Sequence, residues 1–160
     1  MVFVGFWGDF SLLLSRFASR FVADKFNMPT VHKFEDLEIW QLARSLSIEV
    51  YDLSFREPLV LDHRLRDQLR GSCGSIMDNI AEGFERGSRL EFINSLTVAK
   101  GEIGELKSQL YRALDCHYLT QEKFDKLYEN ANLLTKKTTS FINYLNKTNI
   151  RGQKFKNRTN

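Results

Sequence analysis

A chain of 160 residues with 42% hydrophobic and 27% charged residues has the length and composition of one soluble globular domain with its own core. Its net charge of +3 is unevenly distributed, because residues 147–160 are basic with no acidic residue, whereas residues 28–146 are mildly acidic. This asymmetry argues against a strongly basic nucleic-acid groove built from the body alone. The two cysteines form no CxxC pair, so we expect free thiols in a reducing, cytoplasmic environment.

The first 27 residues differ from the rest of the chain, because they are rich in phenylalanine and lack a clear periodicity. Their densest apolar run, residues 10–14, is too short to span a membrane, and no signal-peptide pattern surrounds it. An amphipathic surface helix and a targeting segment are the alternatives. We favour an N-terminal extension without a folded role over residues 1–27, with Met28 as the working start.

The first two of four expected amphipathic helices flank a loop that contains a proline. Residues 34–53 carry apolar side chains at steps of three and four, at Leu37, Trp40, Ala43, Leu46, Val50 and Leu53. Pro58 excludes helix nearby, and Asp62 is expected to cap a second helix over residues 63–84. The stripe of this second helix includes Ser72 and Ile76.

Apolar residues recur at steps of three and four along the third and fourth helices, among them Leu96 and Leu106 in the third and Leu127 in the fourth. Ser88 and Glu91 form a capping box that predicts the start of the third helix, over residues 89–117. The fourth begins at Thr120, and its pattern continues to Leu145. A period of about 3.5 residues indicates left-handed bundle packing. The sequence therefore predicts an all-α protein, an antiparallel up-down-up-down four-helix bundle over residues 28–146, followed by a disordered basic tail, residues 147–160.

The second helix places small and polar residues on the face that should be buried. Gly71 and Gly74 each cost a helix about 1 kcal/mol relative to alanine, so we expect them to permit the close approach of another helix. That helix belongs either to the same bundle, which we favour, or to a neighbouring subunit. Asn79 is expected to be a hydrogen-bonded polar core residue that fixes register, with Glu82 in the same network, and an acid–base pair is the less favoured reading. The predicted helix-packing residues are Gly71, Gly74, Ile76, Asn79, Glu82 and Gly83.

The chain contains, in this order, HKFEDLEIWQLAR, GSIMDNIAEGFERG, EFINSLTVAKGEIGELKSQLYRALD and GQKF. Over about residues 32–156, these segments resemble the small four-helix-bundle proteins of the 23S rRNA-intervening sequence family, and NIAEGF is the most specific of them. The resemblance implies a bundle that assembles as a ring, typically a pentamer. It also implies similarity to the accessory protein of diversity-generating retroelements, which uses a basic ring to engage nucleic acid and a reverse transcriptase.

Basic residues gather at the start of the second helix and around the turn that follows it. In a ring, these positions repeat into a basic band that contacts phosphates. The alternative, which we favour, is a solvated face whose arginines pair with neighbouring carboxylates. The tail offers two further cations on either side of Phe155. The candidate nucleic-acid-binding residues are Arg64, Arg66, Arg70, Arg86, Arg89, Lys154 and Lys156.

No pattern indicates a catalytic or metal site. Cys116 and His117 are adjacent, and neighbours on a helix diverge by about 100°. No phosphate loop or nucleophile elbow is present, so we expect neither an enzyme nor a bound cofactor or metal. The predicted function is that of a self-assembling, homo-oligomeric binding or scaffold protein that contacts RNA or a ribonucleoprotein such as a reverse-transcriptase complex. The alternative is a protein–protein interaction adaptor with no nucleic-acid role.

Overall fold

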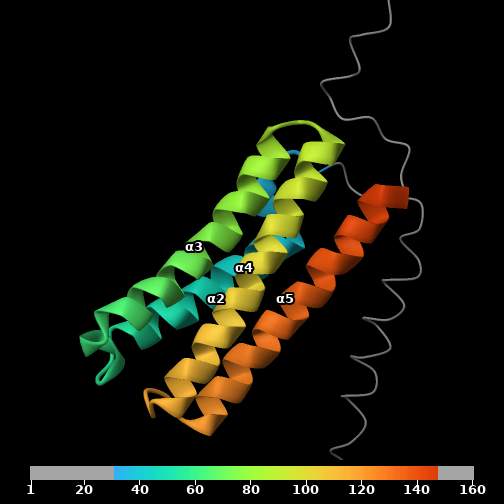
Figure 1. Cartoon of the computed structure of the whole chain (residues 1–160). Helices are drawn as coiled ribbons and strands as arrows, with labels where there is room; N and C mark the ends of the chain where they lie inside the picture. Colours follow the sequence, from blue (N-terminus) through green and yellow to red (C-terminus); the bar gives the residue numbers. More distant parts are fainter. Residues whose placement is uncertain (1–30, 148–160) are drawn as a thin grey trace, which may run out of the picture. The chain divides into compact units, whose positions relative to one another are not determined.

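The structure, a computed structural model, describes residues 31–147, and this part of the chain contains helices and turns but no strand (Figure 1). A 3₁₀ turn, η1 (Phe34–Asp36), leads into α2 (Glu38–Ser54). A second 3₁₀ turn, η2 (Leu59–Leu61), precedes α3 (His63–Glu85), and the chain continues through α4 (Arg89–Asp115) and α5 (Gln121–Lys147). The predicted extension over residues 1–27 lies outside the described residues, as do Lys154, Lys156 and the predicted tail after residue 147.

Neighbouring helices run antiparallel, because the residue number falls on one helix as it rises on its partner. The contacts that show this are Gln68–Arg112 and Ser72–Gln109 between α3 and α4, Phe92–Phe141 and Tyr111–Phe124 between α4 and α5, and Glu38–Lys137 and Glu49–Lys123 between α2 and α5. Since α5 also packs on α2, the four helices close into one bundle. The predicted antiparallel four-helix bundle is confirmed.

Aliphatic side chains from all four helices fill the interior of the bundle. Leu96, Leu106 and Leu127, which the predicted stripes place inside, are fully buried. Burying a side chain of this size stabilises the fold by about 1.5–3 kcal/mol. Trp40 is an exception, since it is only half-buried. In its place, Ile39 is the buried residue of α2 that precedes Ala43 by four positions.

Two of the three predicted capping signals are found at the N-termini of their helices. Asp62 caps α3, and its Oδ1 accepts a hydrogen bond from the Leu65 N–H at 3.0 Å. Thr120 Oγ1 accepts one from the Lys123 N–H at 3.3 Å, at the start of α5. Ser88 is the residue before α4, as predicted, but its side chain makes no capping hydrogen bond, so the capping box is wrong in its hydrogen bonding. The carboxylate of Glu91 forms an ion pair with Arg86, with Oε1 3.8 Å from Arg86 Nη1.

The third helix ends two residues earlier than predicted, because the chain reverses at its C-terminus. His117 has φ 58°, in the left-handed region. Its N–H donates to the Leu114 carbonyl, and the Tyr118 N–H donates to the Ala113 carbonyl at 2.8 Å. These two bonds form a Schellman motif, which satisfies the last carbonyl groups of α4 and turns the chain toward α5.

Candidate interaction surfaces

The two predicted arginine clusters lie at opposite ends of α3. At about 1.5 Å per residue, Arg64 and Arg86 are roughly 33 Å apart along the helix axis. Within one bundle they therefore do not form a continuous basic band.

Several of these arginines are engaged in contacts inside the chain. Arg66 pairs with Asp67 at 2.8 Å and also donates to the Val60 carbonyl at 3.2 Å, and its hydrogen bond to Asp67 raises the pKa of its guanidinium. Arg86 pairs with Glu82, and Arg89 Nη1 donates to the Leu145 carbonyl at 2.9 Å. Arg64 is exposed and has no ion pair among the described residues. Phosphate contact by these arginines stays a prediction.

Arg70 holds α2 and α3 together. Its guanidinium carbon lies 4.7 Å from the ring centre of Tyr51 and 4.5 Å from that of Phe55, and its Nε donates to Ser54 Oγ at 2.7 Å. Cation–π contacts of this kind contribute roughly 0.5–1 kcal/mol each at exposed sites. Because these contacts hold the side chain on the protein surface, Arg70 is less available to a phosphate than the sequence suggests.

The aromatic side chains beside Arg70 belong to an exposed apolar surface. Ile48, Tyr51 and Phe55 are 53%, 46% and 63% exposed and follow one flank of α2 at steps of three and four residues. On α3, Gly74 lies one turn beyond Arg70, and the half-buried Met77 follows three residues later. We call these residues, Ile48, Tyr51, Phe55, Gly74 and Met77, the aromatic face. Exposed apolar surface that is rimmed by polar residues is typical of a binding interface.

The glycines of α3 do not pack as the favoured reading predicts. A Cβ built on Gly71 or Gly74 would meet no atom within 4 Å, so neither glycine serves a close approach inside the bundle, and that prediction is wrong. Gly83 does serve one, because its Cβ would lie 2.6 Å from Ser95 Cβ on α4. The open space beside Gly74 leaves the neighbouring-subunit alternative as a proposal.

The polar residues of α3 also differ from prediction. Asn79 is half-buried and has a hydrogen-bond partner, as predicted, but that partner is in its own helix: Nδ2 donates to the Ser75 carbonyl at 2.8 Å. Glu82 is exposed and pairs with Arg86, so the expected network with Asn79 is wrong. Ile76 is fully buried, as a packing residue should be.

The buried polar pair that sequence reasoning missed joins α3 to α4. Gln109 Nε2 donates to Ser72 Oγ at 2.9 Å, and both residues are buried. Ser72 lies on the predicted stripe, but nothing in the stripe of the third helix indicates that Gln109 faces inward. This pair makes the interhelical polar contact that we had expected of Asn79.

The surface between α2 and α5 is organised around one carboxylate. Glu49 accepts from Lys126 at 2.9 Å and from Lys123 at 3.1 Å, and Asn130 donates to its other oxygen at 3.2 Å. Burial, the largest single influence, raises the pKa of Glu49, but the hydrogen bonds and charges of Lys126 and Lys123 together lower it below its usual value. This cluster ties α5 to α2, and the single carboxylate offsets one of its two lysine charges.

Comparison with known proteins agrees with this architecture. The family model of the 23S rRNA-intervening sequence protein matches residues 35–140. The chain belongs to this family. A solved structure, a protein of unknown function from the S23 ribosomal protein family of Bacteroides thetaiotaomicron at 1.70 Å resolution, matches this family member with a TM-score of 0.60 and 23% identity, over 65% of this chain and 97% of that chain. At that identity the likeness shows the fold alone. No curated protein matches the chain.

Three further features of the described residues bear on the chemistry of this family member. Among residues 31–147, no helix combines the length and hydropathy that crossing a bilayer requires. Within the same residues, no three His, Cys, Asp or Glu side chains come together as metal ligands would. Cys73 is buried in the bundle, and burial raises the pKa of its thiol to about 12, whereas Cys116 is exposed.

Proposed function

We propose that this family member is a non-enzymatic, self-assembling scaffold or binding protein of the cytoplasm that contacts RNA or a ribonucleoprotein, such as a reverse-transcriptase complex. The observation that carries the self-assembly is the aromatic face, where Ile48, Tyr51 and Phe55 are about half or more exposed. Water contact at such side chains is unfavourable by about 25 cal/mol per Å² of apolar surface, so covering this face favours association.

The position of Gly74 supports a second copy of the chain as the partner that covers the aromatic face. A glycine within a helix costs about 1 kcal/mol relative to alanine, and nothing inside the bundle uses the space that Gly74 leaves. A helix of a neighbouring subunit would use it, since a bare backbone allows close approach. The resemblance implies a pentameric ring, whose heterologous interface would place the aromatic face against a different face of the next subunit.

Sedimentation velocity tests this assembly. We expect wild-type protein to sediment as a pentamer, and Phe55→Ser or Gly74→Leu to sediment as smaller species, because the first removes apolar contact and the second fills the space for the neighbouring helix. Leu90→Ser is the matched control, since Leu90 is also 60% exposed but lies on α4, away from this face. A monomeric wild type, or variants that assemble like wild type, would contradict the proposal.

RNA contact is tested by binding at different salt concentrations. We expect binding to weaken steeply as salt rises from about 50 to 200 mM, because phosphate contacts release counterions. The alternative is a protein–protein adaptor, which the mildly acidic body and the apolar character of the aromatic face favour. Absence of RNA binding at low salt by the full chain would leave the adaptor as the better account.

A further inference from the structure

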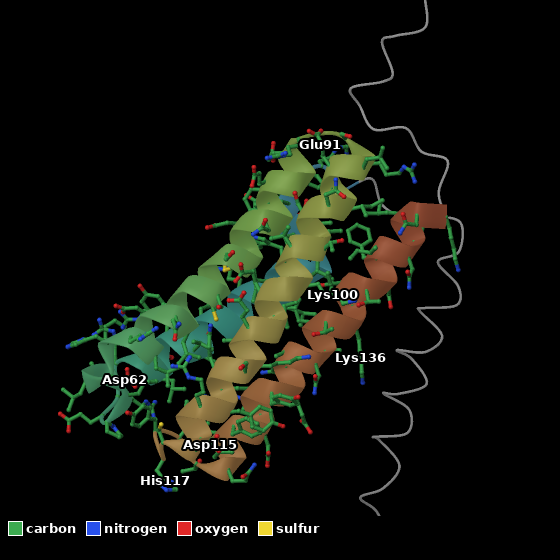
Figure 2. The ribbon with its side chains drawn as sticks, in the orientation of Figure 1. Asp62, Glu91, Lys100, Asp115, His117 and Lys136 are labelled. Atoms are coloured by element: carbon green, nitrogen blue, oxygen red, sulfur yellow. The ribbon has the colours of Figure 1, made fainter. Side chains whose placement is uncertain are left out.

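Three lysines gather on the surface between α4 and α5. Lys100 and Lys107 lie on α4, and Lys136 lies on α5. The ring contacts Phe92–Phe141 and Tyr111–Phe124 set the antiparallel register, which brings Lys136 level with Lys100, and Figure 2 shows the two on adjacent stretches of these helices. Lys107 lies two turns beyond Lys100, about 10 Å along the axis. We call Lys100, Lys107 and Lys136 the lysine face.

No carboxylate neutralises these cations. In the described part of the chain, none of the three lysines forms an ion pair. Within each helix, the residues three and four positions away from each of these lysines are all uncharged, so their own helices offer no ion pair at these spacings. Lys123, Lys126 and Lys137, on the other side of α5, each pair with a glutamate of α2. The two flanks of α5 therefore differ in free positive charge.

The surroundings of the lysine face suit an extended ligand with aromatic groups. Tyr111 is 48% exposed, and its ring centre lies 5.4 Å from that of Tyr128, over whose ring Lys107 lies at 5.8 Å. Gly104 falls midway between Lys100 and Lys107, and a Cβ there would meet no atom within 4 Å. The surface thus combines cations that form no ion pair, an accessible aromatic ring and an open stretch of helix backbone.

We propose that the lysine face binds the backbone phosphates of single-stranded RNA, and that Tyr111 stacks on an unpaired base. This inference rests on the proposed function and names the surface that would perform it, which differs from both arginine clusters. Proteins that bind single strands combine a basic track with aromatic side chains on which successive bases stack. Three cations that span about 10 Å along the helix axis reach only a few phosphates, and stacking needs a base free of its pair, so a single strand fits better than a duplex.

The test measures fluorescence anisotropy of a labelled single-stranded RNA of about 16 nucleotides with the full chain, over a series of salt concentrations. The test variant is K100Q/K107Q/K136Q. The matched control is K123Q/K126Q/K137Q, which changes the net charge equally but removes lysines that are already paired with Glu38 and Glu49. Tyr111→Leu tests stacking separately, and circular dichroism verifies that every variant is folded.

We expect the test variant to lose at least tenfold in affinity and to lower the slope of log K against log salt by about 2, since each single-strand phosphate contact contributes roughly 0.7. The control should retain most of its affinity, and Tyr111→Leu should weaken binding without changing the slope. Equal losses in test and control variants would overturn the lysine face, because net charge alone would then explain binding. Unchanged binding by the test variant would overturn it while leaving the proposed function intact, whereas a wild type that binds no RNA would overturn both.

Discussion

Gly83 lies at a close approach between α3 and α4, where side chains of α4 occupy the space a Cβ would need. That Cβ would lie 2.6 Å from Ser95 Cβ and 2.9 Å from Phe92 Cδ2. We expect Gly83→Ala to destabilise the protein by about 1–3 kcal/mol through overpacking, as measured by urea denaturation. Gly71→Ala is the control, because its Cβ has open space and alanine favours helix, so it should stabilise by about 1 kcal/mol. Similar effects at the two positions would contradict this account.

The two thiols should differ sharply in reactivity. Burial raises the pKa of the Cys73 thiol to about 12, so almost no thiolate is present near neutral pH, whereas Cys116 is exposed at the end of α4. Titration of native protein with an aromatic disulfide reagent should modify one cysteine rapidly and the second only after denaturant is added. Cys116→Ser should abolish the rapid phase, and its persistence in that variant would show that Cys73 is accessible.

Local signals in the sequence predicted residues well where the reason is local. Asp62 and Thr120 cap their helices because each side chain reaches an N–H three residues ahead. It was harder to predict the roles of Asn79, Gly74 and Gly83, because each role depends on what lies opposite the residue in another helix. Side-chain type alone did not show that Gly83 faces Ser95 and that Gly74 faces open space.

At the scale of elements, the contact of α5 with α2 depends on Glu49. Because lysines lower the pKa of Glu49 in the folded state below its usual 4.5, the unfolded chain binds the proton more tightly. The stabilisation by Glu49 is therefore fully present above about pH 4.5 and is lost as the pH falls through the lowered value.

The measurement is thermal stability as a function of pH. We expect Glu49→Gln to cost about 1 kcal/mol near neutral pH, because Lys123 and Lys126 lose their partner, and to cost less in acid. Asp52→Asn, on the same helix but without a resolved ion pair among the described residues, is the control. A cost for Glu49→Gln that stays constant with pH would count against the ion pairs.

The buried pair between α3 and α4 should show strong coupling. Ser72→Ala removes the acceptor of Gln109 Nε2, and Gln109 Oε1 already lacks a partner among the described residues, so we expect a loss of about 1–3 kcal/mol. Ser72→Ala/Gln109→Leu removes both polar groups and should restore most of this stability. A double-mutant cycle from urea denaturation measures the coupling, and additive losses would contradict it.

The helices themselves were predicted from periodicity because residues of the buried face recur at steps of three and four along each, and Leu96, Leu106 and Leu127 are buried as expected. The Ser72–Gln109 pair could not be predicted in this way, since a glutamine beside the stripe of α4 has the same spacing whether it faces solvent or α3. Helix ends depended on backbone conformation, as at His117, where the left-handed φ stops α4 earlier than the stripe suggests.

At the scale of the molecule, short connections and four stripes were sufficient to predict the closed bundle. The distribution of charge over its faces was not predictable in the same way. Counting charge over residues 28–146 argued against a basic groove, yet the acids that offset Lys123, Lys126 and Lys137 do not offset the lysine face. Only the pairing of helices separates the two groups of lysines.

Assembly through the aromatic face predicts that stability depends on protein concentration. Subunit association favours the folded state by mass action, so the thermal midpoint of wild-type protein should rise as concentration rises. Phe55→Ser should make the midpoint independent of concentration, while Leu90→Ser should behave like wild type. Scanning calorimetry over a hundredfold range of concentration measures this, and a constant wild-type midpoint would contradict assembly.

One carboxylate links the two connections at the end of the bundle opposite the α3–α4 turn. While Oδ1 of Asp62 accepts from the Leu65 N–H in the first turn of α3, its Oδ2 accepts from the Tyr118 hydroxyl at 3.3 Å, in the connection that follows α4. Loops without such a link open independently, each with its own local free energy. Here the loosening of either loop removes a bond from the other, so amide protons on both should exchange with solvent as a single cooperative unit.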